Sequence, residues 1–397
     1  MDLSYGPEYE AFRAGIRAFL DARAADAPRA SISAAEDGPE IRKWQKTLIE
    51  HGYTARIVPS EYGGFGAAPD LLETVIINEE FSRAGVSQGM ENQGISMFVP
   101  TLLTYGTEDQ KKRWIGPTIR GEMIWCQGYS EPDAGSDLAS LRTRAVLDGD
   151  EFVINGQKIW TTSAREAQMM FALVRTEPDA SKHAGISYLC LSMDSPGLEV
   201  RPLKTMLGTS SFNEVFFEDV RVPRDNLIGK RGQGWEVGTT TLFHERNMLG
   251  SSKQTENMLR RCEAVLRDVG GLDDPLYRDR LLRLQGRALA MKYHGLRVLT
   301  DRLKGRGSGV AGLITKLNGC QLNHDISALA IDALGEHGVL KRGSKYVREQ
   351  GNWQNQYMFT LGLIIGGGTA QIQKNIISER GLGMPREPKP AAPQGVR

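Results

Sequence analysis

One short stretch of the chain, residues 129–163, brings together residues suited to holding a planar ligand. Its first part is a turn that reads Ser-Glu-Pro-Asp-Ala-Gly-Ser-Asp, from Ser130 to Asp137. Small and hydroxyl-bearing residues around a proline let backbone amides and short hydroxyls approach a flat ring closely. Its second part is rich in β-forming residues, with turn signals at 148–150 and 155–156 that predict a three-stranded meander.

The turn and the Trp160-x-Thr162 pair, in this order and spacing, resemble the acyl-CoA dehydrogenase family, and the resemblance runs along essentially the whole chain. In that family the turn wraps the flavin of FAD, and the Trp-x-Thr pair covers the flavin ring and hydrogen-bonds to it. Alternation along a strand places Trp160 and Thr162 on the same face. The alternative for Trp160 is an aromatic residue of the hydrophobic core. The resemblance implies that FAD contacts the following residues: Gln127, Tyr129, Ser130, Gly135, Ser136, Trp160 and Thr162.

A second candidate for chemistry is Glu245, which lies on an apolar stripe of a predicted helix. Leu242 precedes it by three residues, and Met248 and Leu249 follow it by three and four, so the four share one face. A carboxylate in an apolar setting is costly unless it has a task, and desolvation raises its basicity. Oxidation of a thioester needs such a base for the weakly acidic α-proton, and a flavin to accept the β-hydride. The alternative is a helix-end carboxylate that pairs with a cation or faces solvent.

The resemblance favours Glu245 as the catalytic base. Most members of the family carry the base in a Tyr-Glu-Gly-Thr segment near the C-terminus, where this chain has Gly367 in place of the glutamate. The isovaleryl-CoA, long-chain and actinobacterial sterol-side-chain enzymes carry it in a Glu-Arg pair on an earlier helix, which corresponds to Glu245 and Arg246. Arg246 would orient or neutralise that region, and the alternative for it is a surface salt bridge.

The C-terminal half both matches the family and departs from it. Thr369 and Gln371 resemble the pair that reaches the adenosine or pyrophosphate of FAD, and the alternative for this glycine-flanked segment is a helix start. The family's Arg-x-x-Phe-Gly segment, which holds FAD from the neighbouring subunit, is not found at 273–280, and Gly-Gly-Asn-Gly becomes Gly-Glu-His-Gly at 335–338. Both changes leave room for an unusual dimer or for a related partner chain that completes the site.

Predicted helices, then strands, then helices follow one another without alternating βαβ units, which indicates the α+β class. The resemblance implies an N-terminal helical domain, a central β-barrel or sheet domain and a C-terminal four-helix bundle. We expect these domains at 1–123, 124–233 and 234–382, followed by a proline-rich tail at 383–397. Helical spacing in the last domain predicts helices over about 236–268, 276–304, 308–333 and 354–379.

Composition excludes several classes of protein. The formal net charge is +1 and no basic run stands out, so nucleic-acid binding is not indicated. No apolar run is long enough to span a bilayer, and the first residues lack the apolar core of a signal peptide. The cysteines lack metal-ligand spacing and predict buried thiols in a reducing compartment, hence the cytosol and no metal site. The four cysteines are Cys126, Cys190, Cys262 and Cys320.

The function that these features predict is FAD-dependent α,β-dehydrogenation of an acyl-CoA to the 2-enoyl-CoA in lipid β-oxidation, with electrons passing to an electron-transferring flavoprotein. The glycines at 366–368 remove bulk at the usual base position, which favours a branched, cyclic or bulky acyl group. A homodimer or homotetramer is expected from the resemblance, and a heteromer with a related chain is its alternative. Two other functions stay open: a flavin oxidase of the same fold, and a non-catalytic or half-site subunit of a heteromeric enzyme.

Overall fold

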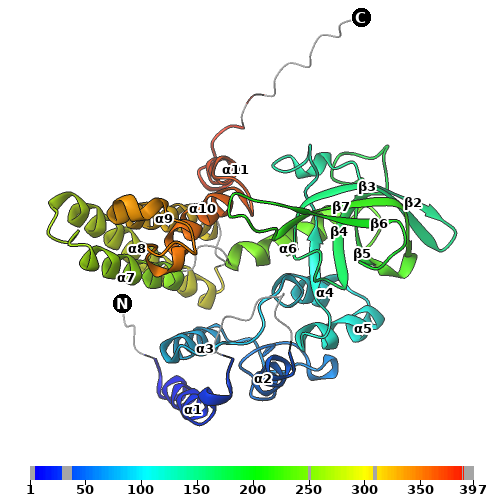
Figure 1. Cartoon of the computed structure of the whole chain (residues 1–397). Helices are drawn as coiled ribbons and strands as arrows, with labels where there is room; N and C mark the ends of the chain where they lie inside the picture. The colour runs from blue at the N-terminus through cyan, green and yellow to red at the C-terminus, as the bar shows by residue number, and fades with distance from the viewer. Residues whose placement is uncertain (1–4, 29–37, 249–251, 307–310, 387, 389–397) are drawn as a thin grey trace, which may run out of the picture. The chain divides into compact units, whose positions relative to one another are not determined.

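The computed structural model of the chain describes residues 5–28, 38–248, 252–306, 311–386 and 388 (Figure 1). The side chains of residues 245–248, 252 and 253 lie outside that description. The chain divides into two compact units, Met1–Glu245 and Arg246–Arg397, and each has a hydrophobic core of its own.

Helices form the first part of the first unit, and their ends follow local sequence signals. The Asp70 carboxylate accepts hydrogen bonds from the amides of Leu72 at 2.8 Å and Glu73 at 3.1 Å, which caps the helix that follows. Thr107 and Gln110 form a capping box at the start of another helix. The helices of this part are α1 (Pro7–Arg23), α2 (Pro39–Glu50), α3 (Leu71–Ala84), α4 (Val99–Tyr105) and α5 (Glu108–Ile119).

A single mixed sheet follows the helices in the first unit. Its strand order is β6-β7-β3-β2-β4-β5-β8, and β1 pairs with β4 in parallel. Most other neighbours are antiparallel, apart from a short parallel contact between β2 and β4. The strands are β1 (Trp125–Gly128), β2 (Arg144–Asp148), β3 (Glu151–Thr162), β4 (Met169–Arg175), β5 (Ile186–Ser192), β6 (Leu198–Leu203), β7 (Phe212–Pro223) and β8 (Leu227–Ile228).

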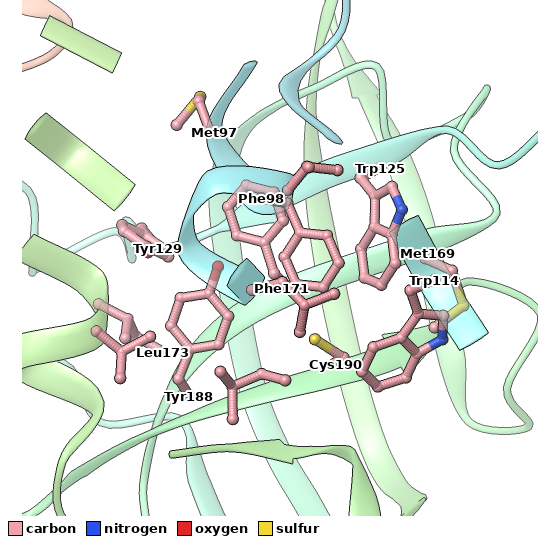
Figure 2. Close-up of a cluster of buried hydrophobic side chains, with 14 of the residues drawn as sticks. Met97, Phe98, Trp114, Trp125, Tyr129, Met169, Phe171, Leu173, Tyr188 and Cys190 are labelled. Carbon is pink, nitrogen blue, oxygen red and sulfur yellow. The ribbon is translucent and has the colours of Figure 1, made fainter. Parts of the chain in front are cut away.

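Strand β4 is buried on both faces, because it separates two hydrophobic clusters. Phe171 and Leu173 face a cluster shared with the N-terminal helices, whereas Met170 and Ala172 face a second cluster inside the sheet. Figure 2 shows the first cluster, in which the ring of Phe98 from the helical part lies 5.7 Å from the ring of Phe171 with an interplanar angle of 6°. The helical part and the sheet of this unit therefore share one core.

The predicted three-stranded meander is wrong at its second turn. Asn155 and Gly156 do not reverse the chain, because β3 runs without a break through both of them. The Asn-Gly pair instead lies at a register shift between β3 and β7, where Gly156 has a φ of 148°. A Cβ atom at this position would lie 2.7 Å from the Cα of Thr143, so only glycine fits the bulge. The same dipeptide that suits a hairpin turn suits a bulge, and the pairing of β3 with the distant β7 decides between them.

The first unit ends at Glu245 within the helix α6 (Gly234–Met248), and the second unit is a helical bundle. Its core contains Leu266, Leu284, Leu329 and Trp353, each from a different helix. The helices of the second unit are α7 (Ser252–Asp268), α8 (Pro275–Leu303), α9 (Ala311–Leu334), α10 (Asn352–Ile365) and the short α11 (Ala370–Ile376).

The helices of the second unit follow the predicted ranges, with one clear difference. The continuous helix predicted over 354–379 is wrong, since α10 ends at Ile365 and α11 begins at Ala370. Gly367 and Gly368 lie between them with φ values of 65° and 100°, which a helix does not accommodate. The range predicted at 236–268 covers α7 and all but the first two residues of α6, and residues 249–251 between the two helices lie outside the described residues. The succession of helices, sheet and helices confirms the predicted α+β class.

Three further observations concern classes of site. In the part of the chain that the structure describes, no helix is long and apolar enough to cross a membrane. No group of three or more His, Cys, Asp or Glu side chains among the described residues could hold a metal ion. All four cysteines are buried and free, and burial raises the pKa of the Cys190 thiol well above its ordinary value.

Candidate functional site

The turn that follows β1 is anchored in the shared core. The ring of Tyr129 is buried and meets the ring of Tyr188 edge-on, with centroids 6.3 Å apart. Glu131 and Ala134 exchange backbone hydrogen bonds of 3.1 and 3.0 Å, which closes the Pro-Asp turn between them. Ser130 is half-buried, next to these fixed points. The sequence of this segment therefore produces a rigid turn.

A buried ion pair lies beneath this turn. Lys158 of β3 has no exposed surface, and its ammonium donates to Oε1 of Glu131 at 2.8 Å and to the carbonyl oxygen of Tyr129 at 3.1 Å. The carboxylate of Glu131 also accepts hydrogen bonds from the amides of Arg142 at 2.6 Å and Thr143 at 2.9 Å. Burial lowers the pKa of the Lys158 ammonium to about 8, against the favourable charge of Glu131.

Trp160 stands at an irregular point of β3, two residues beyond the ion pair. The register with β7 shifts between Lys158 and Thr161, and Trp160 has a φ of 61° in the left-handed region. Trp160 is 58% exposed, so it is not a core aromatic in the isolated chain. The ring of Phe212 contacts it edge-on, with centroids 5.9 Å apart. Thr161 is buried, whereas Trp160 is exposed and Thr162 is half-buried.

Three more predicted residues lie in the same region of the first unit. The side-chain amide nitrogen of Gln127, in β1, is buried and has no hydrogen-bond partner in the described part of the chain. Gly135 and Ser136 are exposed in the turn. The structure also brings the turn to the strand directly, because the amide of Ile159 donates to the carbonyl oxygen of Ser130 at 2.9 Å. An exposed indole, an amide without a partner and exposed small residues can together bind a flat, hydrogen-bonding group.

Helix α6 carries Glu245 and is fixed by buried hydroxyls one turn earlier. The hydroxyl of Thr241 is fully buried, 3.0 Å from the hydroxyl of Thr101 and within 3.5 Å of that of Tyr188. Leu242 packs against the shared core, as its place on the predicted apolar stripe requires. The backbone of Glu245 and Arg246 is helical, and both side chains lie outside the described residues.

The predicted C-terminal pair lies at the start of α11 in the second unit. Thr369 caps this helix, with its hydroxyl oxygen accepting from the amide of Ile372 at 3.2 Å, and Gln371 is exposed in its first turn. Beside the cap, the buried ammonium of Lys316 donates to the carbonyl oxygens of Gly368 at 2.6 Å and Ile364 at 3.1 Å. The buried ammonium of Lys316 thus fixes both ends of the glycine segment.

Family models match the chain along nearly all of its length. The N-terminal domain of acyl-CoA dehydrogenase matches residues 6–122, the middle domain matches 126–220 and the C-terminal domain matches 232–382. The chain belongs to the acyl-CoA dehydrogenase family. This acyl-CoA dehydrogenase is an oxidoreductase, and members of its family are flavoproteins that bind FAD.

Similar proteins and structures come from the same family. The acyl-CoA dehydrogenase IpdE1 of Mycobacterium tuberculosis is 39% identical over 355 residues, which cover 88% of this chain and 89% of that protein. The solved structure named Tcur3481-Tcur3483 steroid ACAD has a TM-score of 0.82 and 31% identity, and covers 98% of this chain and 100% of its own. The ChsE4-ChsE5 complex from Mycobacterium tuberculosis has a TM-score of 0.79 and 30% identity, with coverage of 98% and 100%.

The segment where the dehydrogenase lacks Arg-x-x-Phe-Gly is a helix start. Asp274 caps α8 through the amide of Leu276 at 2.8 Å, and Tyr277 donates to the carbonyl oxygen of Asp332 at 3.1 Å. The guanidinium of Arg280 pairs with the carboxylate of Asp332 at 2.8 Å. Arg280, the last residue of this segment, is therefore already bound to its own chain.

Two residues of the region could not be found by motif reasoning alone. Glu131 belongs to the turn that the sequence singled out, but its carboxylate accepts hydrogen bonds from backbone amides and from Lys158 of its own chain. Lys158 reads as an ordinary polar residue of a strand, although it occupies a fully buried position. The available signal was its place in the alternation: Phe152, Ile154 and Lys158 share the buried face of β3.

Proposed function

We propose that this dehydrogenase oxidises the Cα–Cβ bond of an acyl-CoA thioester to the 2-enoyl-CoA, with FAD as its cofactor and Glu245 as its base. The observation that carries the proposal is the exposed indole of Trp160, held at a strained position beside the turn that begins at Ser130. A large exposed aromatic in an uncommon backbone conformation is typical of a ligand site, where strain is retained for function.

The residues around Trp160 fit a flavin ring. The amide nitrogen of Gln127 is buried without a partner in the described residues, and a flavin carbonyl would satisfy it. Trp160 and Thr162 would lie against the ring, with Tyr129 and Ser130 at its edge and Gly135 and Ser136 close to the ring and the pantetheine. When bound, FAD supplies the two-electron acceptor for the β-hydride of the substrate. In the second unit, the adenosine or pyrophosphate would reach Thr369 and Gln371.

Glu245 is the proposed base because the position near the C-terminus where most family members carry the base, Gly367, cannot accept a proton. Gly367 has no side chain at the place where most family members carry the glutamate. Glu245 follows the buried Thr241 by one helical turn, so its backbone continues a well-anchored part of α6. Its carboxylate would take the α-proton while the Cα–H electron pair forms the new double bond, and Arg246 would orient the carboxylate.

The proposed substrate carries a bulky, branched or cyclic acyl group. Gly366, Gly367 and Gly368 carry no side chain at and beside the position where most family members have the glutamate, and this loss of bulk supports a larger acyl group. One of the similar structures is named as a steroid dehydrogenase, which supports a polycyclic acyl group for this chain as well. A panel that ranges from straight-chain to polycyclic acyl-CoA esters tests this part of the proposal.

The proposed partners are an electron-transferring flavoprotein, as the acceptor of the electrons, and a related chain. Two similar structures are named as complexes of two different chains. This dehydrogenase lacks the family's Arg-x-x-Phe-Gly segment, and Arg280 is bound to Asp332. We therefore propose a heteromer in which the partner completes the half of the FAD site that this chain does not carry.

A half-site subunit without catalysis of its own is the second candidate. The observation that favours it is the helix start at Asp274, which occupies the segment where the family binds FAD across the subunit interface. In this case the chain would bind no flavin alone and would raise the activity of its partner.

The experiment is an absorbance titration of the purified chain. The yellow flavin of the wild type is expected to bleach under anaerobic conditions when a suitable acyl-CoA is added. Glu245→Gln is expected to stay yellow and unbleached. Glu236→Gln is the matched control, because Glu236 lies on the same helix and is exposed, with its carboxylate near Tyr105.

Each outcome separates the candidates. Bleaching of Glu245→Gln at the wild-type rate would contradict the base assignment. A colourless chain that becomes yellow only with a related partner would favour the half-site subunit. A coloured wild type that no thioester of the panel bleaches would contradict dehydrogenation.

A further inference from the structure

The ion pair of Lys158 and Glu131 connects three separate segments of the proposed flavin site. Its ammonium binds the beginning of the turn, through the carbonyl oxygen of Tyr129. Its carboxylate binds the end of the same segment, through the amides of Arg142 and Thr143. The third segment is β3 itself, which contributes Lys158.

Glu131 and Lys158 form their hydrogen bonds with each other and with the backbone of their own chain. The carboxylate of Glu131 accepts three hydrogen bonds, two from backbone amides and one from the ammonium. Burial opposes its ionisation, but the charge and hydrogen bond of Lys158 hold the pKa of Glu131 below its ordinary value. Glu131 is 8% exposed and Lys158 is 0% exposed, so solvent screens the pair weakly.

The same pair adjoins the strained point of β3. Trp160 has a φ of 61°, which is unfavourable for a residue other than glycine and persists only where neighbouring contacts hold the backbone. On one side the holding contacts are the Lys158 ion pair and the amide of Ile159 on the Ser130 carbonyl. On the other side the side-chain amide of Asn213 donates to the carbonyl oxygen of Thr161 at 3.0 Å.

A buried ion pair is weak evidence for stability, because an apolar pair of similar size is often as stable. An apolar pair could not bind the Tyr129 carbonyl or the amides of Arg142 and Thr143, so it would release the turn. We propose that Lys158 and Glu131 are positioning residues, which fix the turn and the Trp160 backbone in the arrangement that binds the flavin ring. The inference rests on the proposed function for the identity of the ligand. The fixed conformation of the turn is a property of the chain without ligand and can be tested there.

The experiment compares four variants of the pair with one matched control. Lys158→Met and Glu131→Gln each remove one charge, and the double variant Lys158→Met with Glu131→Leu removes both and avoids a lone buried charge. Glu80→Gln is the control, because Glu80 is 1% exposed and binds Arg13, Arg17 and Arg83 within the helices α1 and α3. Lys158→Arg keeps the positive charge and tests for rescue.

The first readout is the affinity of the apoprotein for FAD, beside its melting temperature. The double variant is expected to bind FAD at least about tenfold more weakly, with a shifted visible spectrum of the bound flavin and a melting temperature near that of the wild type. Lys158→Arg is expected to recover part of the affinity. Glu80→Gln is expected to melt at a lower temperature and to bind FAD as the wild type does.

The second readout needs no flavin. Hydrogen–deuterium exchange of the apoprotein is expected to speed up at 129–143 and 158–163 in the double variant, and not in Glu80→Gln. Wild-type exchange at both segments, or wild-type FAD affinity in a folded double variant, would overturn the positioning role. A wild-type chain that binds no FAD, either alone or with a related partner chain, would contradict the proposed cofactor site, whereas the exchange comparison would still decide whether the pair fixes the turn.

Discussion

The ammonium of Lys316 donates to the carbonyl oxygen of Gly368, 2.6 Å away, and so fastens α9 to the glycine segment before α11. Lys316 is 1% exposed, and it also donates to Ile364 at the end of α10. The last carbonyls of a helix have no partner within the helix, and a cation near them is favourable. One buried charge therefore stabilises the break between two helices that a glycine run produces.

Removal of this charge is expected to destabilise the second unit. Hydrogen bonds to charged groups contribute about 1.5–3 kcal/mol each, so Lys316→Met should lower the unfolding free energy by roughly 3 kcal/mol. Chemical denaturation measures the change. Lys374→Met is the control, because Lys374 is exposed on α11 and its loss should change stability by less than about 0.5 kcal/mol. Equal effects of both variants would show that Lys316 does not hold the segment.

Two glycines of the same region should respond to alanine in opposite directions. Gly368 has a φ of 100°, and a Cβ there would lie 2.6 Å from the side-chain nitrogen Nε2 of Gln373. Gly368→Ala should therefore destabilise the protein by about 1–2 kcal/mol. Gly362 lies inside α10 with no atom within 4 Å of an added Cβ, so Gly362→Ala should stabilise by roughly 0.5–1 kcal/mol. Melting temperatures of the two variants test both signs, and a stabilised Gly368→Ala would contradict the strain.

The sequence predicted more of the fold than of the site. Apolar runs such as that of β4 predicted strands correctly, because burial on both faces leaves no alternation to read. The Asn155-Gly156 turn was predicted wrongly, since the local signal of a hairpin and that of a bulge are the same. The break at Gly367 and Gly368 was also missed, because apolar residues continue with helical spacing on both sides of it.

The same limit applies to the residues around the turn. A motif identified the stretch from Ser130 to Asp137, whereas the strand pattern that placed Trp160 and Thr162 on one face did not include the register shift between Lys158 and Thr161. The role of Lys158 depends on the turn returning beneath β3, and no periodicity encodes that long-range contact. The exposure of Trp160 depends likewise on the register shift with β7, so sequence alone left a core aromatic open.

The exposed indole should be dispensable for stability and needed for the cofactor. Trp160 is 58% exposed, so Trp160→Ala should change the unfolding free energy of the apoprotein by less than about 1 kcal/mol. FAD should bind at least about tenfold more weakly, because base or ring stacking on an aromatic side chain contributes about 1–3 kcal/mol. Trp353→Ala is the contrast, since Trp353 is 1% exposed in the second unit and its loss should cost about 3–5 kcal/mol. Unchanged FAD affinity in Trp160→Ala would remove the main support for the flavin site.

Acid should weaken the N-terminal helices through Glu80. Hydrogen bonds from Arg17, with further ones from Arg13 and Arg83, hold the pKa of Glu80 at about 2, against an ordinary value of 4.5. The folded state thus binds the proton more weakly than the unfolded state, so the contribution of Glu80 is complete above pH 4.5 and disappears as the pH falls toward 2. Loss of one partner from a buried ion pair is costly, and Glu80→Gln should destabilise by roughly 3 kcal/mol at pH 7.

The stability difference between wild type and Glu80→Gln should therefore shrink steadily between pH 4.5 and pH 2, measured by denaturation at each pH. Glu10→Gln is the control, because the carboxylate of Glu10 is 54% exposed and lies 3.6 Å from Arg13. This exposed pair should contribute less than about 1 kcal/mol at any pH. A constant difference between wild type and Glu80→Gln across the acid range would mean that the arginines stabilise Glu80 by packing and not by charge.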